Sequence, residues 1–489
     1  MSDAEIDVAA FGIAFQRFME RVHELSGPRT SPLRDRVAEH LEADPAELPT
    51  VTEQVPSTDL PNVQLAVEAL LEAAPGWELI GLPAEARHYG GFSLASLLSG
   101  RMGPHIDAAP PTYVNVPVAV GEVHACVELG VYLLTYDGTP VVLLVASGME
   151  HAPRPGLSLE VLSPDLSVSE RFIKRVRELM HEHDVYRGKV LGFAFSEHGG
   201  FGITFQQVPD LPREAVILPE ADLDAIERHT ITIAAHADAL RSSGRHLKRG
   251  LLLYGPPGTG KTLSVMYLCG QMPDRTTVLL SGIGAGALGQ AMAIARSLQP
   301  SMVVLEDVDL VAMERTMPGH GTNPLLFQLL NEMDGLAEDA DIVFVLTTNR
   351  VDLLEPALAA RPGRIDQAVE VKLPDADSRR RLLELYLRGV AHDIEAPDGL
   401  AAAVARTEGV SAAFVKELVR RAVVAGLTAG EEVLTAERLD DALTDLLEHS
   451  APILRSTLGA NPEAAGAVGD REAVQSAVPG ISPAGWSRL

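Results

Sequence analysis

The sequence predicts an α/β protein: a five-stranded parallel sheet covered by helices, with an α+β region before it and a helical region after it. Three observations predict this fold. Within residues 213–374, short apolar runs alternate with helical stretches, which is typical of a parallel sheet covered on both faces. A glycine-rich turn directly follows the first of these runs. Residues 375–450 then have helical periodicity throughout.

The length, net charge and cysteine content of the chain limit its expected number of domains, its partners and its compartment. The chain has 489 residues, which is more than one hydrophobic core organises, so we expect about three domains. Its formal net charge of −27 argues against duplex DNA or an anionic membrane as the main partner. Cys126 and Cys269 are too few for a disulfide framework or a zinc site and indicate a reducing compartment. We therefore expect a cytoplasmic protein that binds no nucleic acid.

No segment predicts a membrane span. The N-terminus lacks a basic start followed by an apolar core, so it does not resemble a secretory signal. The most apolar region, 114–146, is interrupted by acidic residues and glycines, so we do not expect it to cross a bilayer.

The N-terminal part divides by its periodicity. Residues 1–110 are expected to be mostly helical, because apolar residues recur at intervals of three and four. Residues 111–212 are rich in valine and contain an Asp-Gly turn signal, so we expect a β-rich region, with a second hairpin at 189–208. Four histidines of this part have no spacing typical of metal ligands, so we expect no metal site from His88, His105, His124 and His151.

The α/β region and its flanks follow in order. Residues 213–374 form the expected sheet domain, and the amphipathic stretches of 375–450 predict a separate helical domain. Residues 451–489 are rich in Ala, Gly, Ser and Pro and are expected to be a disordered tail. The five expected strands are 250–254, 276–281, 302–306, 342–347 and 368–373.

The stretch "LLLYGPPGTGKT" (251–262) is an apolar strand, a glycine-rich loop and a helix start. It fits the P-loop pattern G-x-x-x-x-G-K-[ST], whose backbone N–H groups and helix N-terminus surround phosphate oxygens. Lys261 is expected to neutralise the β- and γ-phosphates, and the Thr262 hydroxyl to ligate Mg²⁺. The expected nucleotide contacts are Gly255, Pro256, Pro257, Gly258, Thr259, Gly260, Lys261, Thr262 and Leu263.

From about 216 to 449 the chain resembles the AAA ATPases, the clade of the AAA+ superfamily that includes proteasomal and membrane-protease ATPases. Besides the P-loop, the resemblance rests on "NEMDGLAEDADIVFVLTTNRVDLLEPALAARPGRIDQAVEVKLPD" (331–375), which is similar to the clade's second region of homology. It implies a P-loop α/β domain at 213–374, a helical lid at 375–450, and ATP with Mg²⁺ as cofactors. It also implies ATP hydrolysis in a homo-oligomeric ring, usually a hexamer.

The resemblance assigns further residues. Asn349 matches the sensor position, where a neutral amide orients the attacking water. Arg361 and Arg364 match the arginine-finger pair, which stabilises charge on the phosphoryl group bound by a neighbouring subunit. Fingers supplied in trans need a repeated head-to-tail interface, and such an interface closes into a ring.

The segment "TEGVSAAFVKEL" (407–418) resembles the family's lid segment. Gly409 and Ala413 are expected to let the lid helix approach the nucleotide. Glu408 occupies a position where the family often has a nucleotide-contacting histidine, so the ribose contact is expected to differ here.

The acidic pair of "VVLEDVDL" (303–310) stands in the reverse of the family's usual order. Glu306 is expected to hold Mg²⁺ through water, and Asp307 to polarise the attacking water; Asp309 also matches the family. A misplacement of about 1 Å can cost 10²-fold in rate. Because every other hydrolytic element is present, we expect hydrolysis, but slow hydrolysis.

The expected pore segment, 279–298, contains no aromatic residue, and Ile283 is its bulkiest residue before the helix. The nearby loop 312–324 offers Met313, Met317 and His320 as possible substrate contacts. This favours remodelling or disassembly of protein complexes, with the substrate held by the N-terminal domain, over strong processive unfolding. Two alternatives stay open: a nucleotide-switched scaffold with very low turnover, and a nucleic-acid-associated ATPase, which the net charge disfavours.

Overall fold

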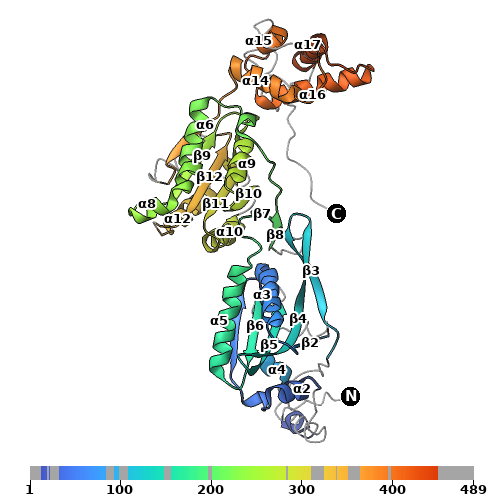
Figure 1. Cartoon of the computed structure of the whole chain (residues 1–489), viewed down its shortest axis with the longest axis vertical. Helices are drawn as coiled ribbons and strands as arrows, with labels where there is room; N and C mark the ends of the chain where they lie inside the picture. The colour runs from blue at the N-terminus through green and yellow to red at the C-terminus, as the bar shows by residue number, and fades with distance from the viewer. Residues whose placement is uncertain are drawn as a thin grey trace, which may run out of the picture. The chain divides into compact units, whose positions relative to one another are not determined.

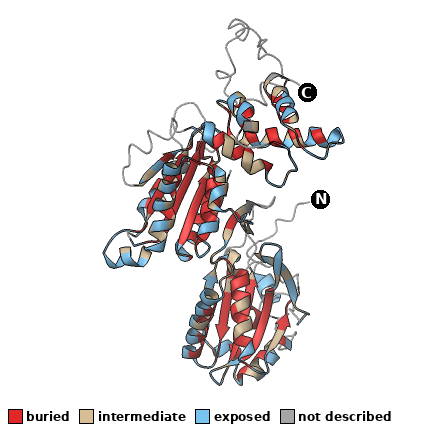
Figure 2. Cartoon of the chain, turned by 45° about the horizontal axis from the view of Figure 1, so that its top comes forward, coloured by how far each residue is buried: buried red, intermediate tan, exposed pale blue. Residues whose placement is uncertain are grey.

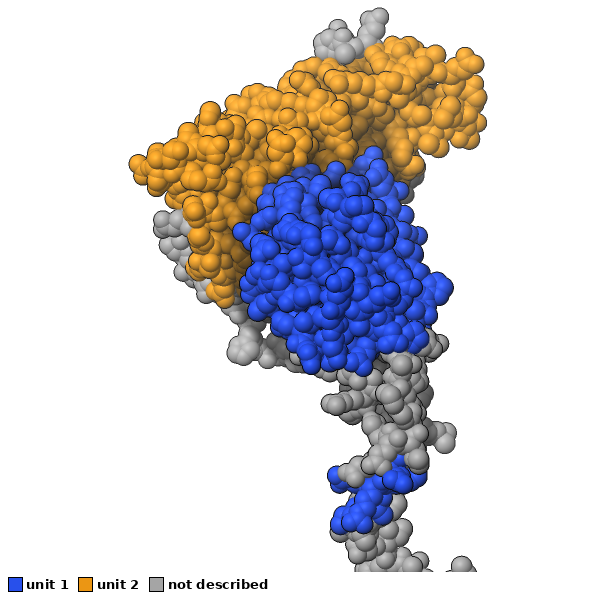
Figure 3. All heavy atoms as spheres, turned by 60° about the horizontal axis from the view of Figure 1, so that its bottom comes forward, with its two compact units in different colours: residues 1–207 blue, residues 208–489 orange. Residues whose placement is uncertain are grey.

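The chain folds as two compact units, Met1–Gln207 and Val208–Leu489 (Figure 1; coloured separately in Figure 3). The structure is a computed structural model of the whole chain. It describes residues 13–18, 21, 32–83, 93–98, 108–147, 156–195, 201–281, 285–309, 324–337, 339–350, 364–394 and 398–449.

The first unit contains a six-stranded antiparallel sheet. Its strand order is β1-β6-β5-β4-β2, and β3 pairs with β4. Asp137 and Gly138 link β4 to β5 with φ of 50° and 75°, the two positive values that a type I′ hairpin turn needs and that Asp-Gly predicts. The strands are β1 (Thr50–Val55), β2 (Glu78–Gly81), β3 (Thr112–Ala119), β4 (Glu122–Tyr136), β5 (Thr139–Ser147) and β6 (Leu157–Leu162).

Helices pack on both faces of this sheet, and much of the sheet is buried (Figure 2). Successive side chains of a strand point to opposite faces, so Leu143 packs under α3 and α5 whereas Leu144 packs with α2 and α4. The helices are α2 (Pro32–Leu41), α3 (Leu60–Glu72), α4 (Leu94–Leu98) and α5 (Leu166–Glu182). Residues 13–18 are also helical.

The first unit differs from its expected division into a helical and a β-rich part. β1 and β2 lie within 1–110 and join the same sheet as the later strands. β1 was missed because it is short, half exposed and flanked by prolines that indicated a loop. The second expected hairpin is confirmed: β7 (Val190–Phe195) pairs antiparallel with β8 (Phe201–Phe205).

The second unit contains five strands paired in parallel in the order β13-β9-β12-β11-β10. β11 and β12 are buried along nearly their whole length, which is why they appear as continuous apolar runs. The strands are β9 (Arg249–Tyr254), β10 (Thr276–Ser281), β11 (Ser301–Glu306), β12 (Ile342–Thr348) and β13 (Gln367–Glu370). The helices of this part are α6 (Glu220–Glu227), α7 (Ile233–Ala235), α8 (Ala237–Ser242), α9 (Lys261–Gln271), α10 (Ala285–Ser297) and α12 (Pro324–Asp334).

A helical subdomain with its own core follows the sheet. Its helices begin at sequence-encoded caps: the side chains of Asp375, Ser411 and Thr435 accept hydrogen bonds from backbone N–H groups of α14, α16 and α17. Phe414 and Leu418 are fully buried in its core. The helices are α14 (Ala376–Leu387), α15 (Ala401–Arg406), α16 (Ala412–Thr428) and α17 (Ala436–Thr444).

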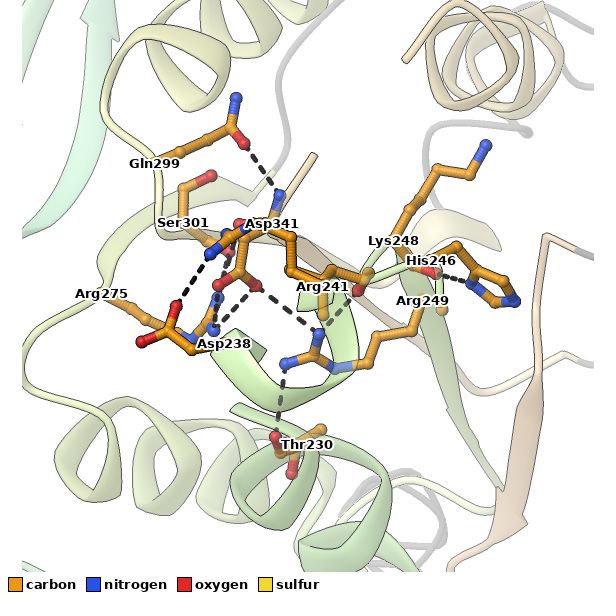
Figure 4. Close-up of polar contacts among 12 residues, drawn as sticks. Thr230, Asp238, Arg241, His246, Lys248, Arg249, Arg275, Gln299, Ser301 and Asp341 are labelled. Atoms are coloured by element: carbon orange, nitrogen blue, oxygen red, sulfur yellow. Dashed lines mark hydrogen bonds and ion pairs between the residues drawn. The ribbon is translucent and has the colours of Figure 1, made fainter. Parts of the chain in front are cut away.

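A buried ionic cluster ties the starting ends of three parallel strands together (Figure 4). The Asp341 carboxylate lies before β12, 2.8 Å from Nη2 of Arg275 before β10 and 3.6 Å from Nη1 of Arg249 in β9. Arg249 Nη1 also donates to the Leu247 carbonyl. Burial, together with the nearby Arg275 charge, lowers the pKa of Arg249 to about 10. Two buried cations thus share one carboxylate, so the cluster depends on Asp341.

We expect Asp341→Asn to destabilise the sheet domain by about 3–5 kcal/mol, because it removes the carboxylate that pairs with both buried guanidinium groups. The measurement is the shift of the thermal and denaturant unfolding transition of the full chain. Asp238→Ala is the control, because Asp238 pairs with Arg241 on the exposed surface (Figure 4), and its loss should cost less than about 1 kcal/mol. Equal effects of the two variants would contradict the prediction.

Candidate nucleotide-binding site

The glycine-rich loop connects the end of β9 to the start of α9, as the sequence predicted. Gly255 has φ of 143°, and a Cβ there would overlap the carbonyl oxygen of Val371, so only glycine fits. Gly260 has φ of 109° and is the N-cap of α9, which begins at Lys261. The first N–H groups of α9 therefore face the loop, where an anion is stabilised.

The loop lysine lies among opposite charges. Lys261 is buried, and its Nζ donates to the carbonyl oxygens of Gly255 (2.9 Å) and Pro256 (2.8 Å). Burial lowers the pKa of Lys261, and the carboxylates of Asp307 and Asp309 oppose this shift. An ammonium group has three donors, so Lys261 can also bind a phosphate oxygen.

The remaining loop residues divide by exposure. Thr259 is buried and its hydroxyl donates to the Pro256 carbonyl at 2.9 Å, which shapes the loop from inside. Pro257 and Thr262 are exposed, so the Thr262 hydroxyl is open to a ligand, and Leu263 is half-buried behind it.

The lid helix rests directly on this loop. The Ala413 N–H, in the first turn of α16, donates to the Gly258 carbonyl at 3.0 Å. A Cβ on Gly258, whose φ is 74°, would lie 2.9 Å from Ser411 Oγ and 3.0 Å from Ala413 Cβ. Gly409 has φ of 76° and precedes this contact. Of the two expected lid residues, Ala413 therefore contacts the P-loop, and the approach of this helix to a nucleotide stays a prediction.

The acids and the sensor asparagine meet where β11 and β12 end. Asn349 Nδ2 donates to Asp307 Oδ1 at 3.1 Å. The buried carboxylate of Asp309 accepts from Thr348 Oγ1 at 2.9 Å and from the Asn349 N–H at 3.1 Å. The Asp307 N–H donates to Thr347 Oγ1 at 3.0 Å. Parallel pairing brings these residues to the same sheet edge as the P-loop.

Glu306 has an oxygen suited to a metal shell. It is the last residue of β11, and its Oε1 is buried without a hydrogen-bond partner in the part of the chain that the structure describes. Burial and, to a lesser extent, the Glu306 charge raise the pKa of Cys269 in α9 to about 12. Carboxylate and hydroxyl oxygens are the ligands that Mg²⁺ prefers, so Glu306 and Thr262 fit the expected metal. Within the described residues, no cluster of three or more His, Cys, Asp or Glu side chains is arranged to hold a metal by itself.

Of the two arginines expected as fingers, Arg364 is described and Arg361 lies outside the described residues. Arg364 donates through Nε and Nη2 to the carboxylate of Asp334 at the end of α12. The possible pore contacts Ile283, Met313, Met317 and His320 lie outside the described residues, as do the expected tail 451–489 and three of the four histidines, His88, His105 and His151. His124 lies 3.1 Å from the carboxylate of Glu68.

The sequence predicted no functional role for two threonines of the site. Thr347 and Thr348 end an otherwise apolar strand, and both hydroxyls bind groups of the acidic segment. The available signal was their position: polar side chains at the carboxyl end of a buried parallel strand face the site. For Asp309, the sequence indicated only a match to the family. In the structure, its buried carboxylate accepts a hydrogen bond from the backbone N–H of Asn349.

We expect Gly258→Ala to weaken binding of a fluorescent ATP analogue by about tenfold or more, because the new methyl group strains a left-handed residue and displaces the lid. Titration of the analogue measures this effect. Gly289→Ala is the control: Gly289 lies in α10, where a Cβ meets nothing within 4 Å, so binding should be unchanged and stability should rise by about 1 kcal/mol. Unchanged affinity in Gly258→Ala would contradict the lid contact.

Comparison with known proteins agrees with this geometry. Residues 251–373 match the model of the family described as "ATPase family associated with various cellular activities (AAA)". The ATP-dependent zinc metalloprotease FtsH 2 of Sphaerobacter thermophilus is 34% identical over 218 residues, which cover 42% of this chain and 33% of that protein. FtsH 4 of the same organism is 32% identical over 283 residues, covering 54% and 42%. FtsH 2 of Symbiobacterium thermophilum is 31% identical over 264 residues, covering 50% and 44%.

The chain thus spans less than half the length of each of these relatives. The matched range includes the P-loop, Glu306, Asp307, Asn349 and most of the strands that position them. In the described residues, no helix is both long and apolar enough to cross a membrane. The second unit of this chain therefore contains an AAA ATPase module, similar to the modules of ATP-dependent zinc metalloproteases.

Proposed function

We propose that this protein is a cytoplasmic, ATP-hydrolysing AAA ring that remodels or disassembles protein complexes. The observation that carries the proposal is the contact of Asn349 with Asp307 at 3.1 Å, beside the P-loop lysine. A site that only binds nucleotide needs the P-loop and the lid. It does not need a carboxylate and an amide, here Asp307 and Asn349, paired next to the expected position of the γ-phosphate. The pair supports hydrolysis as the purpose of the site.

In the proposed reaction, the oxygen of a water molecule attacks the γ-phosphorus of ATP. The bond from this phosphorus to the β–γ bridging oxygen breaks, and its electron pair leaves with ADP. Asp307 accepts the water proton and releases it to solvent, while the Asn349 amide orients the water and Lys261 neutralises the phosphates. Thr262 and Glu306 would hold Mg²⁺, which would supply positive charge for the phosphate oxygens.

The proposed assembly is a homo-oligomeric ring, and a hexamer is the usual state of the family. Arg361 and Arg364 then complete the site of the neighbouring protomer, where a guanidinium fork stabilises the charge of the transferring group. In the single chain, Arg364 is held by Asp334. Assembly therefore has to keep this ion pair at the interface or exchange it for the neighbour's nucleotide.

The proposed substrate is a protein held by the first unit (residues 1–207, blue in Figure 3). The β3–β4 hairpin exposes the apolar side chains of Tyr113, Val120 and Val123, and apolar patches on a soluble surface are typical of protein contacts. The expected pore segment, 279–298, has no aromatic side chain to grip a threaded chain, which favours partial remodelling over processive unfolding.

The alternative function is a nucleotide-switched scaffold with very low turnover. The reversed order of Glu306 and Asp307 favours it, because each carboxylate is displaced by about one bond length from the family's arrangement. An ATPase assay at two protein concentrations separates the two functions, since fingers supplied in trans make the specific activity rise with assembly.

We expect Asp307→Asn to lower kcat by at least about 10³-fold while ATP still binds, because the variant loses the group that accepts the water proton. Steady-state hydrolysis and equilibrium ATP binding are measured on the same preparation. Glu306→Gln is the comparison and should weaken the dependence on Mg²⁺ more than it lowers kcat at saturating Mg²⁺. Turnover that survives in Asp307→Asn but is lost in Glu306→Gln would reverse the two roles.

The trans action of the fingers predicts complementation between inactive variants. Lys261→Ala lacks the phosphate-binding lysine and Arg361→Ala lacks a finger, so each alone should be inactive. In mixed rings, an Arg361→Ala site that faces a Lys261→Ala neighbour is complete, and the co-expressed pair should hydrolyse ATP. In the control, the Arg361→Ala protomer is replaced by one that carries both Lys261→Ala and Arg361→Ala. No site in these mixed rings has Lys261, so they should be inactive. Mixed rings without activity would show that the finger is not supplied in trans.

A further inference from the structure

The carboxyl ends of β11 and β12 are joined by side-chain hydrogen bonds in both directions. From β12, the Thr347 hydroxyl accepts from the Asp307 N–H, and Asn349 Nδ2 donates to the Asp307 carboxylate. From the segment after β11, Asp309 accepts from the Thr348 hydroxyl and the Asn349 N–H. Thr347 is 1% exposed, so its bond to Asp307 does not compete with water.

Asp307 has an unusual backbone. Its φ is 48°, in the left-handed region, and only two other non-glycine residues of the described chain, Glu42 and Asp137, have positive φ. Asp137 occupies a hairpin turn that requires this conformation. Asp307 instead directly follows a buried parallel strand. Aspartate tolerates the left-handed region better than residues with longer side chains.

We propose that Thr347 is a positioning residue that adapts the site to the order Glu306–Asp307. By binding the Asp307 N–H, the Thr347 hydroxyl holds the Asp307 backbone in its left-handed conformation. This conformation brings the short aspartate carboxylate to the Asn349 amide at 3.1 Å. The left-handed backbone of Asp307 thus gives its carboxylate the reach that the additional methylene group of a glutamate would otherwise supply.

This inference rests on the proposed hydrolysis, and it contradicts the alternative function, in which the reversed acidic pair supports very little turnover. That alternative predicts that the usual order of the two acids improves turnover, and that Thr347 matters only for folding. An adapted site predicts the opposite. A glutamate at 307 would carry a longer side chain on a backbone held for a shorter one, so Asp307→Glu should lower kcat.

The test compares Thr347→Val, which removes only the hydroxyl, with Thr347→Ser, which keeps it. Thr347→Val should lower kcat by about 10- to 100-fold, the size expected for a misplacement of about 1 Å, while KM for ATP changes less than about threefold. Thr347→Ser should retain kcat within about threefold. Thr277→Val is the matched control, because Thr277 is a buried strand threonine on β10 whose hydroxyl interacts with the Cys269 thiol and, among the described residues, with no group of the segment from Glu306 to Asp309.

A double-mutant cycle of Asp307→Glu and Thr347→Val adds a measurement of kcat that a purely structural role of Thr347 would not change. Asp307→Glu should cost less in the Thr347→Val background than in the wild-type background, because the released backbone can move to fit the longer side chain. Crystal structures without nucleotide should show positive φ at residue 307 in the wild type and in Thr347→Ser, but not in Thr347→Val.

Three outcomes would overturn the inference. Thr347→Val with wild-type kcat would reject it and leave the proposed function intact. If Thr347→Val and Thr347→Ser lost the same amount of kcat and the same amount of thermal stability, Thr347 would have a folding role only. Absence of hydrolysis by the wild-type chain at every concentration would reject the proposed function and this inference together.

Discussion

Parallel pairing of β9, β11 and β12 is the constraint on which the site depends. Parallel strands end at the same edge, so the P-loop after β9, the acids at the end of β11 and the asparagine after β12 converge there. The order β11-β12-β9 places β12 between the other two, and its last residues therefore face both the loop and the acids. Gly255 N–H donates to the Thr348 carbonyl at 3.3 Å, which joins loop and sensor directly.

Helix α16 of the helical subdomain completes this arrangement through a backbone hydrogen bond to the P-loop. The Ala413 N–H belongs to the first turn of α16, where N–H groups lack helical partners, and the Gly258 carbonyl supplies one. The same first turn is capped by Ser411, so the end of the helix is fixed from both sides. A change in the shape of the P-loop is therefore passed to a helix of 17 residues that crosses the lid core.

Much of the second unit could be predicted from the sequence because its signals are local. The strands and the P-loop follow from apolar runs, glycines and a lysine at fixed spacing, and the structure has them within a few residues of the expected bounds. The left-handed backbone of Asp307 and the bond to Thr347 could not be predicted, because they depend on the register between β11 and β12. β1 was missed for a related reason: only its pairing with β6 distinguishes it from a loop.

The buried Arg249, Arg275 and Asp341 lie at the edge of the sheet opposite to the nucleotide site. If one of the strands slid past its neighbour, a guanidinium group would be left in the interior without its carboxylate, and this penalty resists shear of the sheet. The sheet is thus anchored at one end and carries its chemistry at the other. If the proposed hydrolysis changes the shape of the P-loop, the starting ends of β9, β10 and β12 should therefore keep their register while the opposite ends of the strands adjust.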